Sequence, residues 1–352
     1  MPIYTADQLR RVGRAVFRAT GAPEDIAARV ADSLVDANLT GHDSHGVMRI
    51  PQYVNGIATG EIIVDARPHI ARETAATALV DGGWTFGQVG AEYATRTAVA
   101  KAKEMGVAAV GLVRGHHIGR LGEYAEMASA EDVILMVVAG GFGGGHGAAP
   151  YGGAGIAYGT NPLAFGVPAG ERPDVMVDFA TTAVAAGKIR VAMAKGEQLP
   201  PGCIADNQGR PTTNPADYFA GGFLMPAGGH KGYGLAVVIE LLGQVFTGAE
   251  TLAEANLGGP FYARSGSLFL ALDAGLFRPR GEYAAAIDAR LARIKAVPPA
   301  PGFAEVLVPG EPELRARKRR AAEGIPVAEA TWEAIRAATA SLGVDVDAVA
   351  AG

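Results

Sequence analysis

The sequence of 352 residues contains a single cysteine, Cys203. One cysteine excludes an intramolecular disulfide and any metal site built from four cysteines. The chain also lacks an apolar run approaching the ~20 residues that a membrane-spanning helix requires, and its first ten residues lack the apolar stretch of a signal peptide. We therefore expect a cytoplasmic protein that does not engage a membrane.

Charged residues are also few, at 19% of the chain, and the net charge is −5. The basic residues are scattered except at residues 315–320, so the sequence has no basic footprint for nucleic acid. Hydrophobic residues make up 49%, which predicts a sizeable core rather than disorder. The length allows two domains, or one large domain with an appendage.

The 49 glycines and 21 prolines are abundant and gather in a few segments, which indicates loops around a ligand. One of these, residues 140–147, follows a predicted strand, and Gly143, Gly145 and Ala148 satisfy the loose glycine fingerprint of dinucleotide-binding folds. That fingerprint requires a helix to begin there, and Pro150 with the glycines after it prevents one. We predict a loop at this point and not a Rossmann fold.

The first 60 residues have the periodicity of helices and no strand signal. Thr5 with Gln8 three residues later predicts a capping box, and Gly21 is placed just past the end of that helix. A second helix is expected to begin at Pro23, and a third to cover about residues 50–58.

From residue 76 onward, predicted strands alternate with predicted helices. The strands are expected at residues 76–80, 107–113, 133–138, 175–178, 267–272 and 304–308. The helices are expected at residues 88–105, 121–130, 184–194, 232–246, 283–296 and 328–340. This alternation is typical of an α/β protein with a central mixed, largely parallel sheet. We expect residues 71–311 to form this cofactor-binding domain, and residues 1–70 plus 312–352 to form a helical domain from both chain ends.

Residues 41–51 concentrate the side chains that suit acid–base chemistry. A proton donor (His45), a hydroxyl (Ser44) and a guanidinium (Arg49) can hold and protonate a small carboxylate-bearing substrate. The alternative is a polar loop between two helices. Ser44 lacks the elbow motif of hydrolases, and its position next to His45 makes a direct hydrogen bond between them awkward. No acidic or cysteine cluster accompanies His42 and His45, so no metal site is expected.

Two other candidate segments follow predicted strands, where ligands commonly bind in α/β proteins. His116 and His117 come after the strand at 107–113, and a solvated pair of histidines in a turn is the alternative. Asp178 ends another predicted strand and suits ribose hydroxyls. Lys188 in the next helix suits a phosphate, although taken alone it is better explained as a surface lysine.

His230 and Lys231 lie among the glycines of residues 228–234, directly before an apolar helix. Free N–H groups and the helix dipole at such a helix start favour an anion. The segment lacks the spacing of a P-loop, and a tight connection that needs glycine for packing is the alternative.

Eight blocks of the chain, taken in order, carry a resemblance to a known family. They are residues 41–53, 115–123, 159–165, 178–189, 201–215, 228–243, 306–311 and 324–326. Together they resemble the malate/L-lactate dehydrogenase family of the non-Rossmann type, which includes L-sulfolactate, hydroxycarboxylate and ureidoglycolate dehydrogenases and Δ1-piperideine-2-carboxylate reductases. The resemblance implies a cytoplasmic homodimer with a cofactor fold of non-Rossmann topology. It also implies a small-molecule carboxylate substrate and NAD or NADP as cofactor, with NAD favoured.

The resemblance further implies roles for single residues. His45 matches the catalytic proton donor, with Ser44 and Arg49 as its neighbours, and Thr160 matches a threonine on the substrate side. The implied cofactor-binding positions are His117, Ile118, Gly119, Arg120, Leu121, Asp178, Phe179, Ala180, Lys188, Ile189, His230, Lys231, Pro309, Gly310, Glu311 and Arg315. One departure is that residues 140–147 are richer in glycine than the family pattern. The family resemblance therefore does not predict the shape of the pocket wall at this segment.

These residue types suit the implied reaction, an NAD(P)-dependent oxidoreduction of a small 2-oxo or 2-hydroxy carboxylic acid. Reduction of the carbonyl group leaves an alkoxide, and a histidine with its unperturbed pKa of ~6.5 can exchange the required proton near neutral pH. Arg49 can clamp the substrate carboxylate through two parallel hydrogen bonds. The alternatives are a reductase of cyclic imino acids such as Δ1-piperideine-2-carboxylate or Δ1-pyrroline-2-carboxylate, a silent ligand-binding protein, and a metal-dependent hydrolase.

Overall fold

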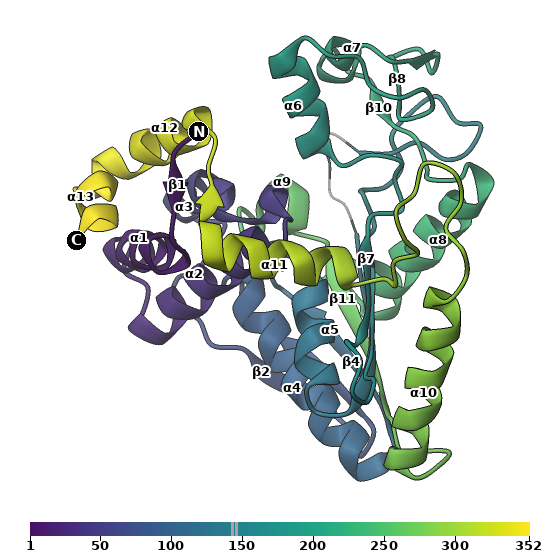
Figure 1. Ribbon diagram of the computed structural model, residues 1–352. Coiled ribbons are helices and arrows are strands. Elements are labelled where there is room, and N and C mark those ends of the chain that lie inside the picture. Colours follow the sequence, from purple (N-terminus) through teal and green to yellow (C-terminus); the bar gives the residue numbers. More distant parts are fainter. Residues whose placement is uncertain (142–143, 145–146) are drawn as a thin grey trace.

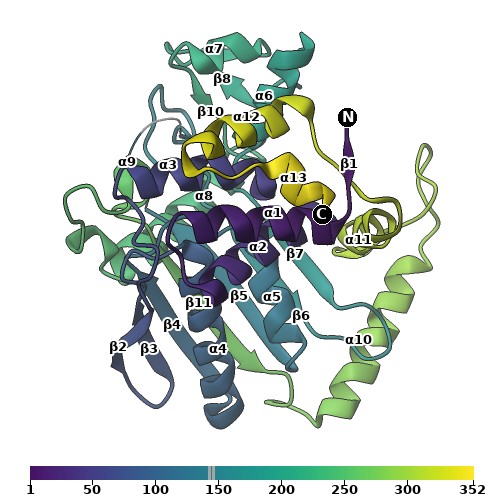
Figure 2. The ribbon, with the colours of Figure 1, turned by 90° about the vertical axis from the view of Figure 1, so that its left-hand side faces the viewer.

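The computed structural model describes residues 1–141, 144 and 147–352. A seven-stranded sheet stands at the centre with helices on both faces, and a group of helices from both chain ends packs beside it (Figure 1). Both termini lie in this helical group (Figure 1 and Figure 2). There β1 (Ile3–Tyr4) pairs with β12 (Ile325–Pro326), and α1 (Ala6–Ala19) packs against α13 (Val346–Ala351).

The strand order across the central sheet is β2–β3–β4–β11–β5–β6–β7. The strands are β2 (His69–Glu73), β3 (Thr77–Asp81), β4 (Val107–Val113), β5 (Val133–Gly140), β6 (Leu163–Val167), β7 (Val175–Phe179) and β11 (Gly266–Asp273). Only β3 and β4 are parallel neighbours, and the other five neighbouring pairs of this sheet are antiparallel. The predicted mixed α/β fold of non-Rossmann topology is confirmed, but the predicted largely parallel pairing is wrong.

The main cause of the pairing error is the late strand β11. The units β3–α4–β4 and β4–α5–β5, built with α4 (Gly87–Met105) and α5 (Gly122–Ser129), do run their strands in one direction, as the alternation predicts. However, β11 enters between β4 and β5, antiparallel to both, so that Phe269 lies opposite Val110 and Val137. A mostly buried apolar strand has no polar face to indicate its neighbours, so its place could not be predicted.

The two faces of the sheet are covered by different helices (Figure 1). α4 and α5 pack on one face, and the buried side of α4 is built from small alanines. α8 (His230–Glu240) and the π-helical segment η3 (Leu241–Phe246) that continues it pack on the other. Gly243 permits this close approach, because a Cβ there would overlap the backbone nitrogen of Gly140.

The helical group consists of α1, α2 (Glu24–Leu39), α3 (Ile50–Ala58), α12 (Glu329–Thr339) and α13. The predicted capping box of α1 is confirmed: Gln8 N donates to Thr5 Oγ1 at 3.2 Å, and Thr5 N donates to Gln8 Oε1 at 2.7 Å. Phe17 and Trp332 are fully buried in one apolar core with Phe86, which precedes α4. The division at residues 70 and 312 stays a prediction.

A small three-stranded antiparallel sheet with two helices stands beyond one end of the main sheet (Figure 1). It contains β8 (Ile204–Ala205), β9 (Pro211–Thr212), β10 (Phe223–Leu224), α6 (Ala186–Lys195) and α7 (Pro215–Phe219). The remaining helices are α9 (Gly259–Tyr262), α10 (Arg280–Lys295) and α11 (Glu311–Glu323). The 3₁₀ turns are Asp43–His45, Val47–Arg49, Ala249–Thr251 and Ala340–Leu342.

Two predicted segments, the strand at residues 304–308 and the loop at residues 140–147, have different outcomes. The strand expected at residues 304–308 is wrong: the segment is irregular, and it is followed by Pro309, whose carbonyl accepts a hydrogen bond from Met176 N of β7 at 3.2 Å. Gly143 and Gly145 of the glycine fingerprint lie outside the described residues, and residues 147–162 contain no helix. None of the described helices is both long and apolar enough to cross a membrane.

Candidate active site

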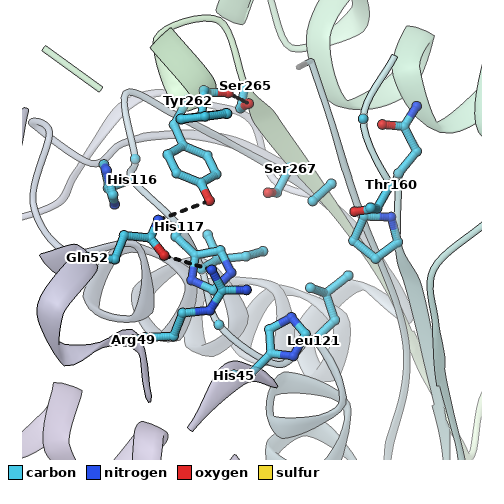
Figure 3. Close-up of a pocket in the computed structure, with 18 of the residues that line it drawn as sticks. His45, Arg49, Gln52, His116, His117, Leu121, Thr160, Tyr262, Ser265 and Ser267 are labelled. Atoms are coloured by element: carbon cyan, nitrogen blue, oxygen red, sulfur yellow. Dashed lines mark hydrogen bonds between the residues drawn. The ribbon is translucent and has the colours of Figure 1, made fainter. Parts of the chain in front are cut away.

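A cavity of about 550 Å³ lies where the helical group meets the ends of β4, β5 and β11. Figure 3 shows His45 and Arg49 on one side of it and Tyr262, Ser265 and Ser267 on another. Glycines, hydroxyls and aromatic rings share the wall with these charged and titratable groups. The volume falls in the range of pockets that hold small ligands and cofactors.

His45 is carried by two consecutive 3₁₀ turns between α2 and α3. Asn38 at the end of α2 secures them, since its Oδ1 accepts from Val47 N at 2.8 Å and its Nδ2 donates to Asp43 Oδ1 at 2.6 Å. Arg320 of α11 donates to both oxygens of the same Asp43 carboxylate, from Nη1 at 2.6 Å and from Nη2 at 3.0 Å. The C-terminal helix α11 therefore helps to aim a side chain near the N-terminus.

Ser44 joins the two main functional side chains. Its Oγ lies 3.0 Å from His45 Nδ1, and its carbonyl accepts a hydrogen bond from Arg49 Nε at 2.6 Å. A direct Ser44–His45 hydrogen bond, expected to be awkward for sequence neighbours, does form, because the tight 3₁₀ turn brings the two side chains together. Arg49 also donates from Nη1 to Gln52 Oε1 at 2.7 Å, and no described residue accepts from its Nη2.

Three histidine rings gather at the cavity. The rings of His45 and His117 stack with centroids 5.6 Å apart, and His116 lies 4.6 Å from the ring centroid of Tyr262. Burial lowers the pKa of His45 and of His116 to about 3, and at His45 repulsion by Arg49 adds to the effect. Burial also holds the pKa of His117 well below its usual range. All three imidazoles are therefore neutral at neutral pH, which corrects the assumption of an unperturbed His45.

Seven predicted site residues line this one cavity. They are His45, Arg49, Thr160, His117, Ile118, Gly119 and Leu121. Gly119 has a φ of +78°, a conformation that favours glycine and lets the backbone of the loop turn along the cavity wall. The fold thus brings the turn at 41–51 together with the loop at 115–121 and with Thr160.

The other predicted cofactor positions do not line this cavity, and their roles stay predictions. They are Arg120, Asp178, Phe179, Ala180, Lys188, Ile189, His230, Lys231, Pro309, Gly310, Glu311 and Arg315. Arg120 is buried in an ion-pair cluster, with Asp36 at 3.2 Å and Glu126 at 2.9 Å. The Asp178 carboxylate accepts from Gly122 N at 2.7 Å, where α5 begins, and burial raises its pKa.

Other members of that set have structural partners of their own. Ile189 is buried in the core beneath the small sheet. His230 lies at the start of α8 with its ring 6.0 Å from Tyr151. Glu311 pairs with a lysine of α10 at 2.7 Å, and Arg315 makes two hydrogen bonds to Glu305 at 2.7 and 2.8 Å. Lys188 is exposed on α6, in line with its simpler interpretation as a surface lysine.

Several lining residues were not predicted as site residues. They are Met48, Gln52, Asn55, Glu61, Arg190, Tyr262, Ser265 and Ser267, whereas His116, which also lines the cavity, was a candidate from the sequence. Gln52 could have been found, because it lies three positions after Arg49 and residues at that spacing share a helix face. The segment that carries Tyr262 has no motif, so only the fold places it here. Among the described residues, no three His, Cys, Asp or Glu side chains gather closely enough to hold a metal.

Residues 4–336 match the malate/L-lactate dehydrogenase family, and the chain belongs to this family. Hydroxycarboxylate dehydrogenase B of Escherichia coli (strain K12) is 36% identical over 348 residues, covering 97% of this chain and 94% of that protein. The structure of sulfolactate dehydrogenase from Methanocaldococcus jannaschii has a TM-score of 0.89 at 34% identity, over 99% of each chain. That of Δ1-piperideine-2-carboxylate reductase from Pseudomonas syringae has a TM-score of 0.81 at 28% identity, over 96% of this chain and 100% of that one.

Membership of this family makes the protein an oxidoreductase of the dehydrogenase class, which requires a nicotinamide cofactor. The residues of the cavity fit such a group. Neutral hydroxyls of Thr160, Ser265 and Ser267 line it and suit an amide and ribose hydroxyls, while Gly115 and Gly119 leave part of the loop wall without side chains. The cationic Arg49 suits an anion.

The buried, neutral histidines predict a stability that depends on pH. The pKa of His116 is about 3 in the folded chain and ~6.5 when unfolded. Between these values the unfolded state binds more protons, so stability falls as the pH drops from ~6.5 towards 3, by up to about 1.4 kcal/mol per pH unit for one such group. We expect His116→Gln to lose less stability than the wild type between about pH 7 and about pH 5, measured by chemical denaturation.

The matched control for this comparison is His69→Gln, which replaces an exposed histidine of β2. It should retain the wild-type slope of stability against pH. Equal slopes for His116→Gln and the wild type would show that His116 does not bind a proton on unfolding.

Proposed function

We propose that the chain transfers a hydride between NAD(P)H and a small 2-oxo or 2-hydroxy carboxylic acid, with His45 as proton donor and acceptor. The observation that carries the proposal is the arrangement around Ser44. Its hydroxyl meets His45 Nδ1 at 3.0 Å, and its carbonyl meets Arg49 Nε at 2.6 Å. One residue therefore fixes a proton-transfer group and an anion-binding group relative to each other in the wall of one cavity.

His45 and Arg49 cooperate in this scheme. When bound, the cofactor supplies or accepts the hydride, and the chain has to handle the proton and the carboxylate. Neutral His45 is ready to accept the hydroxyl proton of a 2-hydroxy acid. In the reverse direction His45 must carry a proton, which burial and the charge of Arg49 oppose in the free protein. A carboxylate bound to Arg49 offsets that repulsion, so substrate binding favours the protonated form when it is needed.

The carboxylate binds to the part of Arg49 that the protein leaves open. Nε is used by Ser44, and Nη1 donates once to Gln52. The Nη2 group and the second N–H of Nη1 remain, and together they form one edge of the planar guanidinium fork. Ser44 and Gln52 thus orient the arginine, and Thr160 is proposed to contact the substrate from the sheet side of the cavity.

The names of the relatives support a 2-hydroxy acid as the substrate. The alternative is an NAD(P)H-dependent reductase of cyclic imino acids, and the similarity to Δ1-piperideine-2-carboxylate reductase favours keeping it. We favour NAD over NADP. Among the described lining residues the arginines are Arg49 and Arg190, and the carboxylate of Glu61 shares the cavity. Once Arg49 holds the substrate, that set leaves Arg190 as one lining arginine for an additional phosphate, with the carboxylate of Glu61 in the same cavity.

A cytoplasmic homodimer is proposed as the working form. Opposite its buried side, the helix of α8 and η3 exposes an apolar row, with exposed fractions from 45% to 70%. The row is Leu235, Val238, Leu241, Val245 and Phe246. Apolar patches of this kind commonly mark protein–protein contacts, and a second copy of the chain is the occupant proposed. Sedimentation equilibrium should give twice the mass of one chain; the mass of a single chain would contradict the dimer.

A substrate panel tests the activity directly. We expect oxidation of small 2-hydroxy acids with NAD and reduction of the matching 2-oxo acids with NADH, followed at the nicotinamide absorbance band. NADPH and the two cyclic imino acids are measured in parallel. A preference for the imino acids would support the alternative, and no turnover of any pair with either cofactor would contradict both functions.

Variants of the turn at 41–51 separate the two proposed roles. His45→Ala should lower kcat by about 10²–10⁴-fold with the dissociation constant of the cofactor nearly unchanged, because only proton transfer is lost. Arg49→Lys should mainly raise KM for the acid, by about tenfold or more, because lysine cannot reproduce the planar fork. Steady-state kinetics and cofactor titration measure these quantities.

The control for both variants is His42→Ala. His42 belongs to the same turn, where its Nε2 lies 3.6 Å from Glu313, but it does not line the cavity. It should keep most of the activity. Retained turnover in His45→Ala, or an unchanged KM in Arg49→Lys, would remove the corresponding role.

A further inference from the structure

Behind the cavity wall, a chain of hydrogen bonds ends on His117. Gln88 Nε2 donates to the hydroxyl of Tyr53 at 2.7 Å, and that hydroxyl lies 2.7 Å from His117 Nδ1. Gln88 and Tyr53 are fully buried and do not line the cavity, whereas His117 does. Gly119 packs beside Gln88, and its φ of +78° favours glycine at this point of the loop.

The direction of this chain determines where His117 carries its proton. A phenol has one proton, and because Tyr53 accepts from the amide of Gln88, its own proton is available for His117 Nδ1. Nδ1 must then offer a lone pair, so the single proton of the neutral ring resides on Nε2. Burial raises the pKa of Tyr53, so the hydroxyl stays protonated and remains the donor. No described residue provides a hydrogen-bond partner for His117 Nε2.

The surroundings of His117 keep the ring neutral. Its titratable and charged neighbours are His45, on which it stacks, Arg49, His116, Tyr53 and Tyr262, and none of the carboxylates among the described residues acts to stabilise a charge on it. A neutral ring adds no positive charge beside His45. His45 can therefore take up and release the substrate proton while His117 acts as a fixed donor.

We propose that Gln88 and Tyr53 are positioning residues that keep the proton of His117 on Nε2, so that His117 offers the C2 oxygen of the substrate a neutral hydrogen-bond donor beside His45. This inference rests on the proposed function and deepens it. It also gives His117 a role different from the cofactor contact that the family resemblance implies. A donor that is already in place where negative charge develops stabilises the alkoxide without reorganisation.

Kinetics of three variants distinguish the two roles of His117. His117→Leu removes the donor and should lower kcat by about 10²-fold or more, whereas His117→Gln keeps a neutral N–H and should retain part of the activity. Tyr53→Phe removes the donor to His117 Nδ1, so that either ring nitrogen can carry the proton. It should lower kcat by on the order of 10-fold, with little change in KM for the cofactor. An unchanged kcat together with a raised KM for the cofactor would overturn the proposal in favour of a cofactor contact.

The tautomer itself is measured by ¹H–¹⁵N NMR of the full chain labelled at histidine, with His117 assigned from the His117→Gln spectrum. We expect a protonated Nε2 and a bare Nδ1 from about pH 5 to about pH 8, and a mixture of tautomers in Tyr53→Phe. A proton on Nδ1 in the wild type would overturn the proposal, because His117 would then donate to Tyr53 instead of accepting from it.

Two further variants test the first donor of these hydrogen bonds and provide a control for loss of a phenol hydroxyl. Gln88→Met removes the first donor without changing Tyr53, and it should shift the tautomer and lower kcat as Tyr53→Phe does. Tyr283→Phe removes a phenol hydroxyl of α10, outside the cavity lining, and should change neither. If no acid is turned over with either cofactor, the proposed function fails, while the NMR result still decides the tautomer. Turnover with unchanged kcat and NMR spectra in both Tyr53→Phe and Gln88→Met would overturn this inference alone.

Discussion

The geometry of the site depends on how the protein compensates one buried cation, Arg120. Its guanidinium is only 2% exposed and pairs with Asp36 of α2 and Glu126 of α5, and Arg317 of α11 binds both of these carboxylates as well. The cluster joins the helical group to the sheet domain beside the loop at 115–121. Removing one partner from such a cluster leaves a buried charge, which typically costs 3–5 kcal/mol. The separation between the turn of His45 and the loop of His117 is fixed for this reason.

Within that frame, each functional side chain is held by a neighbour that does not react. Arg320 and Asn38 secure the turn through Asp43, and Ser44 couples His45 to Arg49. This accounts for Asp43, which has no direct chemical role in the cavity. Such support matters because a catalytic group has to be held close to its productive geometry.

Burial and neighbouring charges give the three histidines of the cavity properties that the sequence does not distinguish. Three histidines meet at one cavity, and all are neutral because burial opposes protonation, an effect to which the charge of Arg49 adds at His45 and His117. His45 belongs to the turn that also carries Arg49, so a substrate carboxylate bound there, as we propose, acts on His45 most directly. On this proposal, the anionic substrate itself raises the proton affinity of His45. The loop at 115–121 provides His117, whose tautomer we propose is set by Tyr53 and Gln88 behind the cavity wall.

Local patterns were sufficient for most helices and strands and for the turn at 41–51, because capping residues, periodicity and glycine act over a few positions. The capping box at Thr5 and the strand at residues 107–113 were predicted in place. Pairing was not, since β11 finds its neighbours through burial, and a buried apolar strand looks the same beside any partner. His45, Arg49 and Thr160 were identified from the sequence. That Tyr262 lines the cavity and Arg120 does not could not be predicted, because both depend on how distant segments pack. The sequence by itself determined which chemical groups are available and the turn that presents them. The tertiary structure alone decided which of them share a cavity and what charge they carry, because distance and burial depend on segments far apart in the chain.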